Sequence, residues 1–180
     1  MGTQKLLLPL GGEPLVHRTV RAVCDAGFDE VLVVVGSDYL EVLEALDGLP
    51  VRHALNPDYA TGMGSSFRTA VAHLSHSDAA MFALADQPLV ASTQYRAVLD
   101  AYRLHLSPIV SVRYGAVMAP PHLFTRELFT ELAVLEHGAR PVLLRHREAT
   151  TVLMFPADLL TDVDTPEDYE RVKIRLSAGV

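Results

Sequence analysis

Several residue types are scarce in this chain, and each scarcity excludes a class of protein. The single cysteine, Cys24, excludes an intrachain disulfide framework and is typical of a reducing compartment, so we expect a cytoplasmic protein. No apolar run approaches the roughly 20 residues that cross a bilayer, and the first residues lack the apolar core of a signal peptide. Lysine and arginine (15) are outnumbered by aspartate and glutamate (22), so we expect no nucleic-acid and no membrane partner.

What the chain does contain is enough apolar material for one core, because 49% of its 180 residues are hydrophobic. We expect a single domain over residues 1–180. Short apolar runs alternate with helical patterns, which predicts an α/β fold with a mostly parallel sheet. The predicted strands are 31–35, 51–55, 79–85, 109–112 and 151–155. The strand at 109–112 opens a less regular stretch that runs through 119–122. The predicted helices are 14–26, 38–46, 67–74, 93–104, 125–135, 139–145 and 166–176.

The most informative junction is the one between the apolar run 79–85 and the sequence Asp86-Gln87-Pro88. The run is typical of a buried parallel strand. Ligands of open α/β sheets bind at the carboxyl ends of the strands, so Asp86 is a candidate ligand for Mg²⁺. The alternative is that Asp86 only turns the chain ahead of the next helix.

A second candidate is the loop Gly62-Met63-Gly64-Ser65-Ser66, directly ahead of a predicted helix. Glycine allows close backbone approach, and a helix start offers free N–H groups to an anion or a base. The alternative is a plain serine N-cap, because the spacing matches neither common phosphate-loop motif.

A third candidate is the segment from Asp162 to Asp168. Thr165, Pro166 and Asp168 form a capping-box start of the last helix, which needs no function. Asp162 and Asp164 lie on the same side of an extended segment, where their charges repel unless a cation is near. With Asp86 they predict a divalent-metal site; exposure to water is the alternative.

Two basic residues are weaker candidates. Lys5 precedes an apolar run. Arg140 follows Gly138 at a predicted helix start, where a guanidinium can bind a phosphate through two hydrogen bonds. Either can equally be a solvated surface charge. The eight histidines have no metal-ligand spacing and are expected at the surface.

Taken in order, these motifs resemble the molybdenum-cofactor nucleotidyltransferases, also described as MobA-like NTP transferases, and most of all the molybdopterin cytidylyltransferase branch. The matching pieces are Met1-Gly2 with Lys5-Leu-Leu-Leu-Pro-Leu, Gly12-x-Pro14-Leu15, Gly62–Ser66, Asp86-Gln87-Pro88, Gly138-Ala139-Arg140 and Asp162–Pro166. The resemblance implies a Rossmann-like three-layer sandwich of the nucleotide-diphospho-sugar transferase type.

The resemblance also implies a reaction and a role for each candidate residue. A phosphate of the acceptor attacks the α-phosphate of CTP or GTP, and pyrophosphate leaves. Lys5 would neutralise the α-phosphate, and Asp86 with Asp164, flanked by Asp162, would hold Mg²⁺. Gly62, Gly64, Ser65 and Ser66 would contact the nucleotide. Arg140 would lie toward a molybdopterin-type acceptor, and a molybdenum hydroxylase is the implied protein partner.

One departure from the family affects both fold and function. The family has a strand and a loop of the form Leu-Ala-Ala-Gly-x-x-x-Arg ahead of the Met-Gly pair, and neither is present in these 180 residues. That strand would be central in the sheet, so its absence leaves two unpaired edges. We therefore expect a chain that is N-terminally truncated relative to the family, a rearranged sheet, or a strand supplied by another copy in a homo-oligomer.

Three functions follow from these observations. The first is Mg²⁺-dependent transfer of CMP from CTP to molybdopterin. The second is nucleotidyl transfer to a sugar phosphate or another small phosphorylated acceptor. The third is a non-catalytic accessory protein that binds the molybdenum cofactor or its enzyme. The missing loop favours the third function. In the family this loop also discriminates the base, so these residues do not predict a preference for CTP or GTP.

Overall fold

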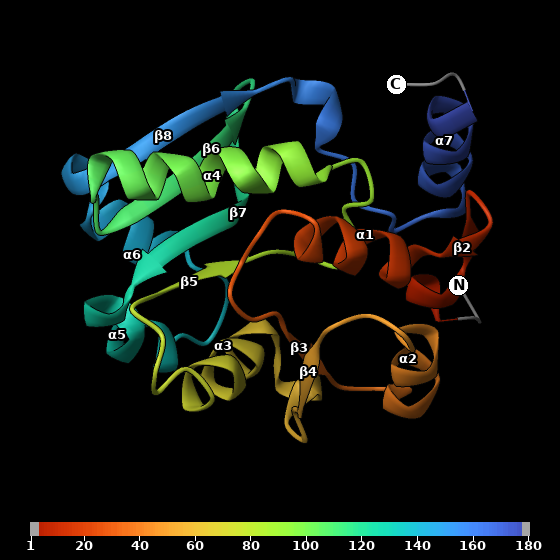
Figure 1. Ribbon diagram of the computed structural model, residues 1–180, viewed down its shortest axis with the longest axis horizontal. Coiled ribbons are helices and arrows are strands. Elements are labelled where there is room, and N and C mark those ends of the chain that lie inside the picture. Colours follow the sequence, from red (N-terminus) through yellow and green to blue (C-terminus); the bar gives the residue numbers. More distant parts are fainter. Residues whose placement is uncertain (1–3, 178–180) are drawn as a thin grey trace.

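The strands lie in three groups, which Figure 1 shows in the computed structural model of residues 4–177. A four-stranded sheet has the order β5-β7-β6-β8, a two-stranded sheet pairs β3 with β4, and a small hairpin pairs β1 with β2. The bounds are β1 Pro9–Leu10, β2 Glu13–Pro14, β3 Leu32–Val35, β4 Arg52–Leu55, β5 Ala79–Phe82, β6 Ile109–Tyr114, β7 Val117–Thr125 and β8 Thr150–Phe155. The Met1-Gly2 part of the resemblance lies outside the described residues.

Helices cover both faces of the larger sheet. One face packs α4, through Tyr95 and Val98, against Val110 and Val112 of β6. The other face packs α3, α5 and α6 against Ile109 and neighbouring apolar residues. The helices are α1 Leu15–Cys24, α2 Tyr39–Ala45, α3 Met63–Ala72, α4 Ser92–His105, α5 Phe129–Ala133, α6 Arg140–Arg145 and α7 Pro166–Ser177, and short 3₁₀ turns are η1 Lys5–Leu7, η2 Tyr59–Thr61, η3 Arg126–Leu128, η4 Arg147–Ala149 and η5 Ala157–Leu159. The predicted α/β class is confirmed.

The sheet directions are more mixed than the alternating pattern predicts. β3 with β4 and β6 with β8 are parallel, whereas β7 is antiparallel to both β5 and β6. The sequence predicted an irregular stretch where the structure has β7, because Pro120-Pro121 interrupts the apolar pattern. β7 nevertheless continues through both prolines, and its register with β6 shifts between Val110 and Val112.

The strand ahead of Asp86 is shorter and less buried than predicted. β5 ends at Phe82, opposite His122, and none of the residues 79–85 is buried. Continuing the ladder would bring Ala83 opposite Pro121, and proline has no N–H to donate. The expectation of a buried parallel strand over 79–85 was therefore wrong in its length, its burial and the direction of its pairing.

The two main sheets are not joined by hydrogen bonds within residues 4–177, so β3 and β5 each have one unpaired edge. This confirms the two free edges expected from the sequence. Along the same part of the chain, no helix is long and apolar enough to cross a membrane.

Candidate functional site

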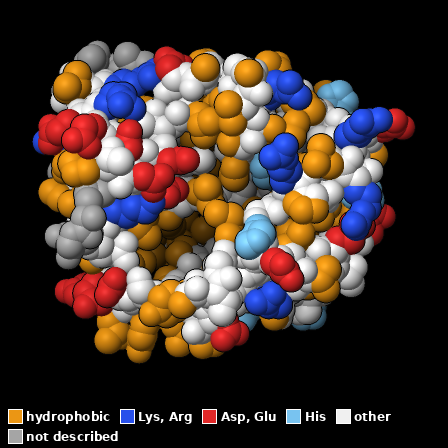
Figure 2. Space-filling model, turned by 180° about the vertical axis from the view of Figure 1, so that it is seen from behind, with side chains coloured by type: hydrophobic (Ala, Val, Ile, Leu, Met, Phe, Trp, Pro, Cys, Tyr) orange, Lys and Arg blue, Asp and Glu red, His pale blue; other side chains and the backbone are white. Residues whose placement is uncertain are grey.

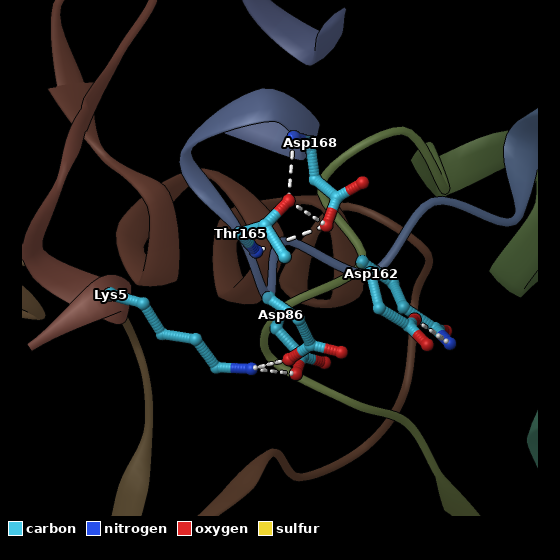
Figure 3. Close-up of polar contacts among 7 residues, drawn as sticks. Lys5, Asp86, Asp162, Thr165 and Asp168 are labelled. Carbon is cyan, nitrogen blue, oxygen red and sulfur yellow. Dashed lines mark hydrogen bonds and ion pairs between the residues drawn. The ribbon is translucent and has the colours of Figure 1, made fainter. Parts of the chain in front are cut away.

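A charged cluster forms where three segments distant in the sequence meet. Lys5 lies in η1, Asp86 follows β5, and Asp164 precedes α7. The Lys5 ammonium donates to Asp86 Oδ2 and to Asp164 Oδ1, each at 2.6 Å (Figure 3). The structure therefore brings together three of the residues that the sequence proposed separately.

A buried valine positions the carboxylates of the segment ahead of α7. Val163 is fully buried in a cluster with Leu10, Leu15 and two other residues, and its N–H donates to Asp86 O at 3.1 Å. The side chains before and after Val163 consequently face away from that cluster. The backbone bond holds this segment beside Asp86, which explains why Asp86 and Asp164 reach the same lysine.

Asp162 and Asp164 differ in their partners, although the sequence grouped them. Asp162 accepts a hydrogen bond from Gln87 Nε2 at 2.9 Å (Figure 3), whereas the hydrogen bonds of the Lys5 ammonium go to Asp86 and Asp164. Desolvation raises the pKa of Asp162; the Gln87 hydrogen bond opposes this, and the charges of Asp86 and Asp164 add to it. Crowding of carboxylates is thus a property of this site, as expected from two aspartates two residues apart.

The ammonium of Lys5 is held in its charged form. Partial burial alone would lower its pKa, but the hydrogen bonds to Asp164 and Asp86 and the two negative charges outweigh burial and raise it. Lys5 therefore compensates the charge of two carboxylates whose oxygens point at one position. That donor set, two hard oxygen ligands converging on a cation, is the one that suits Mg²⁺ or Mn²⁺ together with substrate phosphates.

Within residues 4–177 no group of three or more histidine, cysteine, aspartate or glutamate side chains is arranged to hold a metal ion. Asp86 and Asp164 alone share the lysine, and Asp162 lies to one side on Gln87. A divalent cation here would thus have two carboxylate ligands at most from this cluster, and the remaining positions would fall to water or phosphate.

The capping box ahead of α7 is confirmed. Asp168 Oδ2 accepts from the Thr165 N–H at 3.0 Å and from Thr165 Oγ1 at 2.7 Å, and the Asp168 N–H donates back to Thr165 Oγ1 at 3.2 Å. These bonds account for Thr165 and Asp168 without any ligand. Only the aspartates ahead of the cap remain as candidate functional groups.

The loop proposed for the nucleotide belongs largely to a helix. α3 begins at Met63 rather than near Phe67, so Gly64, Ser65 and Ser66 lie in its first turn, and Gly62 adopts φ +113° ahead of it. Ser65 Oγ donates to Gly62 O at 2.7 Å. The predicted helix start near Phe67 was therefore wrong by four residues. A glycine-serine sequence indicates a loop unless tertiary contacts support a helix.

The residue that organises this turn was missed as a functional candidate. Asn56 follows β4 and is 1% exposed. Its Nδ2 donates to Ser65 Oγ at 2.8 Å and to Ser66 Oγ at 3.2 Å, and its Oδ1 accepts from the Asp58 N–H at 3.0 Å. The sequence did contain a signal for this residue, because Asn56 precedes a proline and directly follows a predicted strand. At such a position an asparagine side chain often stabilises a turn through its own hydrogen bonds.

Gly64 is required by packing. Its N–H donates to Glu136 O at 3.2 Å, and a Cβ on Gly64 would lie 2.1 Å from Leu135 O. The start of α3 therefore lies against the 135–138 segment, where a Cβ on Gly138 would lie 3.7 Å from Met63 Sδ. Close approach of backbone to backbone explains the second glycine of the motif.

Arg140 begins α6, two residues after that contact, and is exposed. The structure thus places the helix start of Arg140 near the start of α3. Among the described residues, no hydrogen bond or ion pair joins Arg140 to the Lys5 cluster or to residues 62–66. The roles expected for Arg140, Gly62, Gly64, Ser65 and Ser66 stay predictions.

Comparisons with known proteins show the family of the chain. Residues 1–152 match the model of the MobA-like NTP transferase domain. The chain is 29% identical to nicotine blue oxidoreductase of Paenarthrobacter nicotinovorans, over 93% of this chain and 87% of that protein. It is 30% identical to the purine catabolism protein PucB of Bacillus subtilis, over 98% of this chain and 91% of that protein.

Among solved structures, Rv0371c of Mycobacterium tuberculosis in complex with manganese superposes with a TM-score of 0.79 at 27% identity, covering 94% of this chain and 91% of that one. The family match spans most of the chain. The chain therefore belongs to the MobA-like NTP transferase family and is a nucleotidyltransferase.

Proposed function

We propose that the chain transfers CMP from CTP to a molybdopterin-type acceptor and releases pyrophosphate, with Mg²⁺ held by Asp86 and Asp164. The observation that carries the proposal is the cluster in which both carboxylates point at one cation, the Lys5 ammonium. The manganese complex of the related Rv0371c supports a divalent ion in this group of proteins. The cytidine and the acceptor rest on the resemblance described above.

The acidic residues and the lysine of the cluster have different proposed roles in the reaction. Asp86 and Asp164 would hold the divalent ion, whose charge, when bound, would offset the negative charge of the triphosphate. The Lys5 ammonium, which pairs with both carboxylates in this structure, would then be released from one or both of them. Lys5 is proposed to lie beside the phosphates and to stabilise the charge that develops at the α-phosphate. The acceptor phosphate oxygen forms the new P–O bond as the bond to pyrophosphate breaks.

The remaining predicted residues bind rather than react. Gly62, Gly64, Ser65 and Ser66 are proposed to hold the nucleotide through the start of α3, and Arg140 is proposed to attract the acceptor phosphate. Asp162 adds negative charge next to the ion-binding carboxylates. It is proposed to bind the ion through water, since its own carboxylate is held by Gln87.

The test is pyrophosphate release from CTP, GTP and ATP, each with Mg²⁺ or Mn²⁺ and with molybdopterin or a sugar phosphate as acceptor. Release that requires CTP and molybdopterin together supports the proposal. Release with a sugar phosphate instead would replace the acceptor and keep the chemistry. Cofactor binding by calorimetry without turnover on any nucleotide overturns the proposal and favours an accessory role.

A further inference from the structure

The buried Asn56 side chain fixes the direction of the side-chain hydrogen bonds at the start of α3. Its Oδ1 accepts from the Asp58 N–H at 3.0 Å, and because a backbone N–H can only donate, the amide cannot be turned round. The Nδ2 group therefore faces the two serines and donates to Ser65 Oγ at 2.8 Å and to Ser66 Oγ at 3.2 Å. Both amide hydrogens are used, and both serine oxygens act as acceptors.

The two serine hydroxyls differ in where their own hydrogens go. A hydroxyl has one hydrogen and two lone pairs. Ser65 Oγ donates its hydrogen to Gly62 O at 2.7 Å, so this hydroxyl is satisfied in both directions. Ser66 is half-buried, and within residues 4–177 no group accepts the hydrogen of its hydroxyl. Ser66 therefore keeps a free donor, and the bond from Asn56 directs that donor away from the amide.

Two backbone N–H groups of this turn are already occupied. The Gly64 N–H donates to Glu136 O at 3.2 Å, and the Ser65 N–H donates to Gly62 O at 3.1 Å. Helix starts often bind anions through such N–H groups, but these two have partners within the protein. The free hydroxyl hydrogen of Ser66 is consequently a stronger candidate for contact with a ligand than either amide.

Asn56 also ties this arrangement to the end of the sheet at which the charged cluster lies. Its backbone N–H donates to Val35 O at 2.8 Å, so it continues the parallel pairing of β3 with β4 past the C-terminal end of β4. Just beyond β3, Asp38 accepts from Gln4, the residue before Lys5. Ligands of open α/β sheets bind at this end of the strands. The serine donor and the charged cluster therefore lie at the same end of the fold.

The molecule has an open depression that a ligand can enter. Figure 2 shows a hollow in the face opposite to the view of Figure 1, and acidic and basic side chains lie on its rim. Ligand sites are typically concave and contain a small number of polar groups that fix the orientation of the ligand. A hydroxyl whose hydrogen has one set direction is a group of that kind.

We propose that Asn56 is a positioning residue for nucleotide binding. By donating to Ser66 Oγ, it directs the Ser66 hydroxyl hydrogen to an acceptor atom of the nucleoside triphosphate, which is a phosphate oxygen or a lone-pair atom of the nucleoside. The inference rests on the proposed contact of residues 62–66 with the nucleotide. It adds the direction of the hydrogen bond and the buried residue that sets this direction.

Asn56→Asp reverses the direction of these bonds with little change in shape. One carboxylate oxygen can still accept from the Asp58 N–H, whereas the other can only accept where the amide donated. The Ser66 hydrogen then turns to the carboxylate and is lost to the ligand. Because the added negative charge also repels a triphosphate, this substitution is combined with Ser66→Ala to separate the two effects.

The test is calorimetric titration of the full chain with CTP, GTP and inorganic tripolyphosphate, each in the presence of Mg²⁺. The variants are Ser66→Ala, Asn56→Asp, the two together, and Ser65→Ala, which removes the neighbouring hydroxyl. Ser75→Ala, an exposed serine beyond the end of α3, is the matched control. Urea denaturation of each variant shows that the affinities are compared between folded proteins.

We expect Ser66→Ala to weaken binding about tenfold, the effect of losing one hydrogen bond to the ligand. Ser65→Ala should weaken it less, because that hydrogen is bound to Gly62 O, and Ser75→Ala should not weaken it. In the Asn56→Asp background, Ser66→Ala should have no further effect. Equal losses with all three probes would assign the hydrogen to a phosphate oxygen, and losses with the nucleotides alone would assign it to the nucleoside.

Three results overturn this inference and leave the proposed function intact. They are unchanged affinity in Ser66→Ala, an equal or larger loss in Ser65→Ala, and a full further loss when Ser66→Ala is added to Asn56→Asp. The last result would mean that Asn56→Asp acts through charge alone. If the parent protein binds none of the three probes, the proposed function fails and this inference fails with it.

Discussion

Lys5 Nζ lies 2.6 Å from Asp86 Oδ2, although 81 positions separate the two residues in the chain. The pair joins the turn after the N-terminus to the end of the β5 segment, and Asp164 completes it from the start of α7. Because the lysine stands where a metal ion would meet both carboxylates, lysine and metal are expected to compete.

Removal of either carboxylate tests the proposed metal site. We expect Asp86→Asn and Asp164→Asn each to weaken Mn²⁺ binding by roughly tenfold or more, since one of two hard anionic ligands is lost. Calorimetry with Mn²⁺ on the nucleotide-free protein measures this without any activity assay. Glu167→Gln, an exposed carboxylate three residues beyond Asp164, is the matched control and should bind Mn²⁺ as the parent protein does. Equal affinity in all three variants would contradict the site.

Removal of the lysine should separate binding from catalysis. Lys5→Ala is expected to tighten Mn²⁺ binding, because the competing ammonium is gone, and to lower kcat by about 10²–10³-fold, the cost of losing one group that stabilises transition-state charge. Lys5→Arg keeps the charge and should retain part of the activity. Weaker Mn²⁺ binding in Lys5→Ala would mean that the lysine supports the metal site instead of competing for it.

Asn56 should act through the start of α3. In Asn56→Ala the buried Ser65 hydroxyl loses its donor, and we expect a loss of about 1–3 kcal/mol in the free energy of unfolding. Urea denaturation measures it, with the exposed Ser75→Ala as control. If the start of α3 also holds the nucleotide, KM for the nucleoside triphosphate rises in Asn56→Ala. An unchanged KM with lowered stability would confine Asn56 to a structural role.

Gly64 and Gly138 form a matched pair of glycines on the same contact. Gly64→Ala would place a Cβ 2.1 Å from Leu135 O, so either α3 or the 135–138 segment must move, and we expect a destabilisation of about 2 kcal/mol or more. Gly138→Ala meets only Met63 Sδ at 3.7 Å, ordinary contact with a flexible side chain. The melting temperatures of the two variants are compared by thermal unfolding. Equal values would show that the backbone around Gly64 can move to accommodate a Cβ at little cost.

His122 was expected at the surface with the other histidines, but it is buried, and its burial predicts a pH dependence of stability. Burial lowers the pKa of His122 from 6.5 to about 4, and its Nδ1 pairs with Ser111 Oγ at 2.9 Å. Below pH 6.5 the unfolded chain binds a proton that the folded protein does not bind until about pH 4, so stability falls as pH falls through this window. Between pH 7.5 and 5 the loss from this residue is about 2 kcal/mol.

The check is urea denaturation of the parent protein and of His122→Gln at both pH values. Glutamine keeps a hydrogen-bonding group for Ser111 and does not titrate. The difference between pH 7.5 and pH 5 should shrink in the variant by about 2 kcal/mol. An equal pH dependence in the two proteins would assign it to other groups.

Elements with strong local patterns were predictable, and elements that depend on distant partners were not. The apolar runs of β3 and β6 and the capping box at Thr165 are readable from adjacent residues, and the structure confirms them. β7 was missed because its prolines contradict strand propensity locally, while pairing with both β5 and β6 supports it. The start of α3 was misplaced because Asn56 and the 135–136 backbone support that turn from outside it.

The sequence by itself determined the α/β class and the candidate carboxylates, because apolar periodicity, strand ends and caps are local properties. Only the tertiary structure decided that Lys5 lies between Asp86 and Asp164 and that Asp162 binds Gln87 instead. These relationships depend on how α1 and the buried Val163 bring remote segments together, and such long-range packing leaves no periodic signal along the chain.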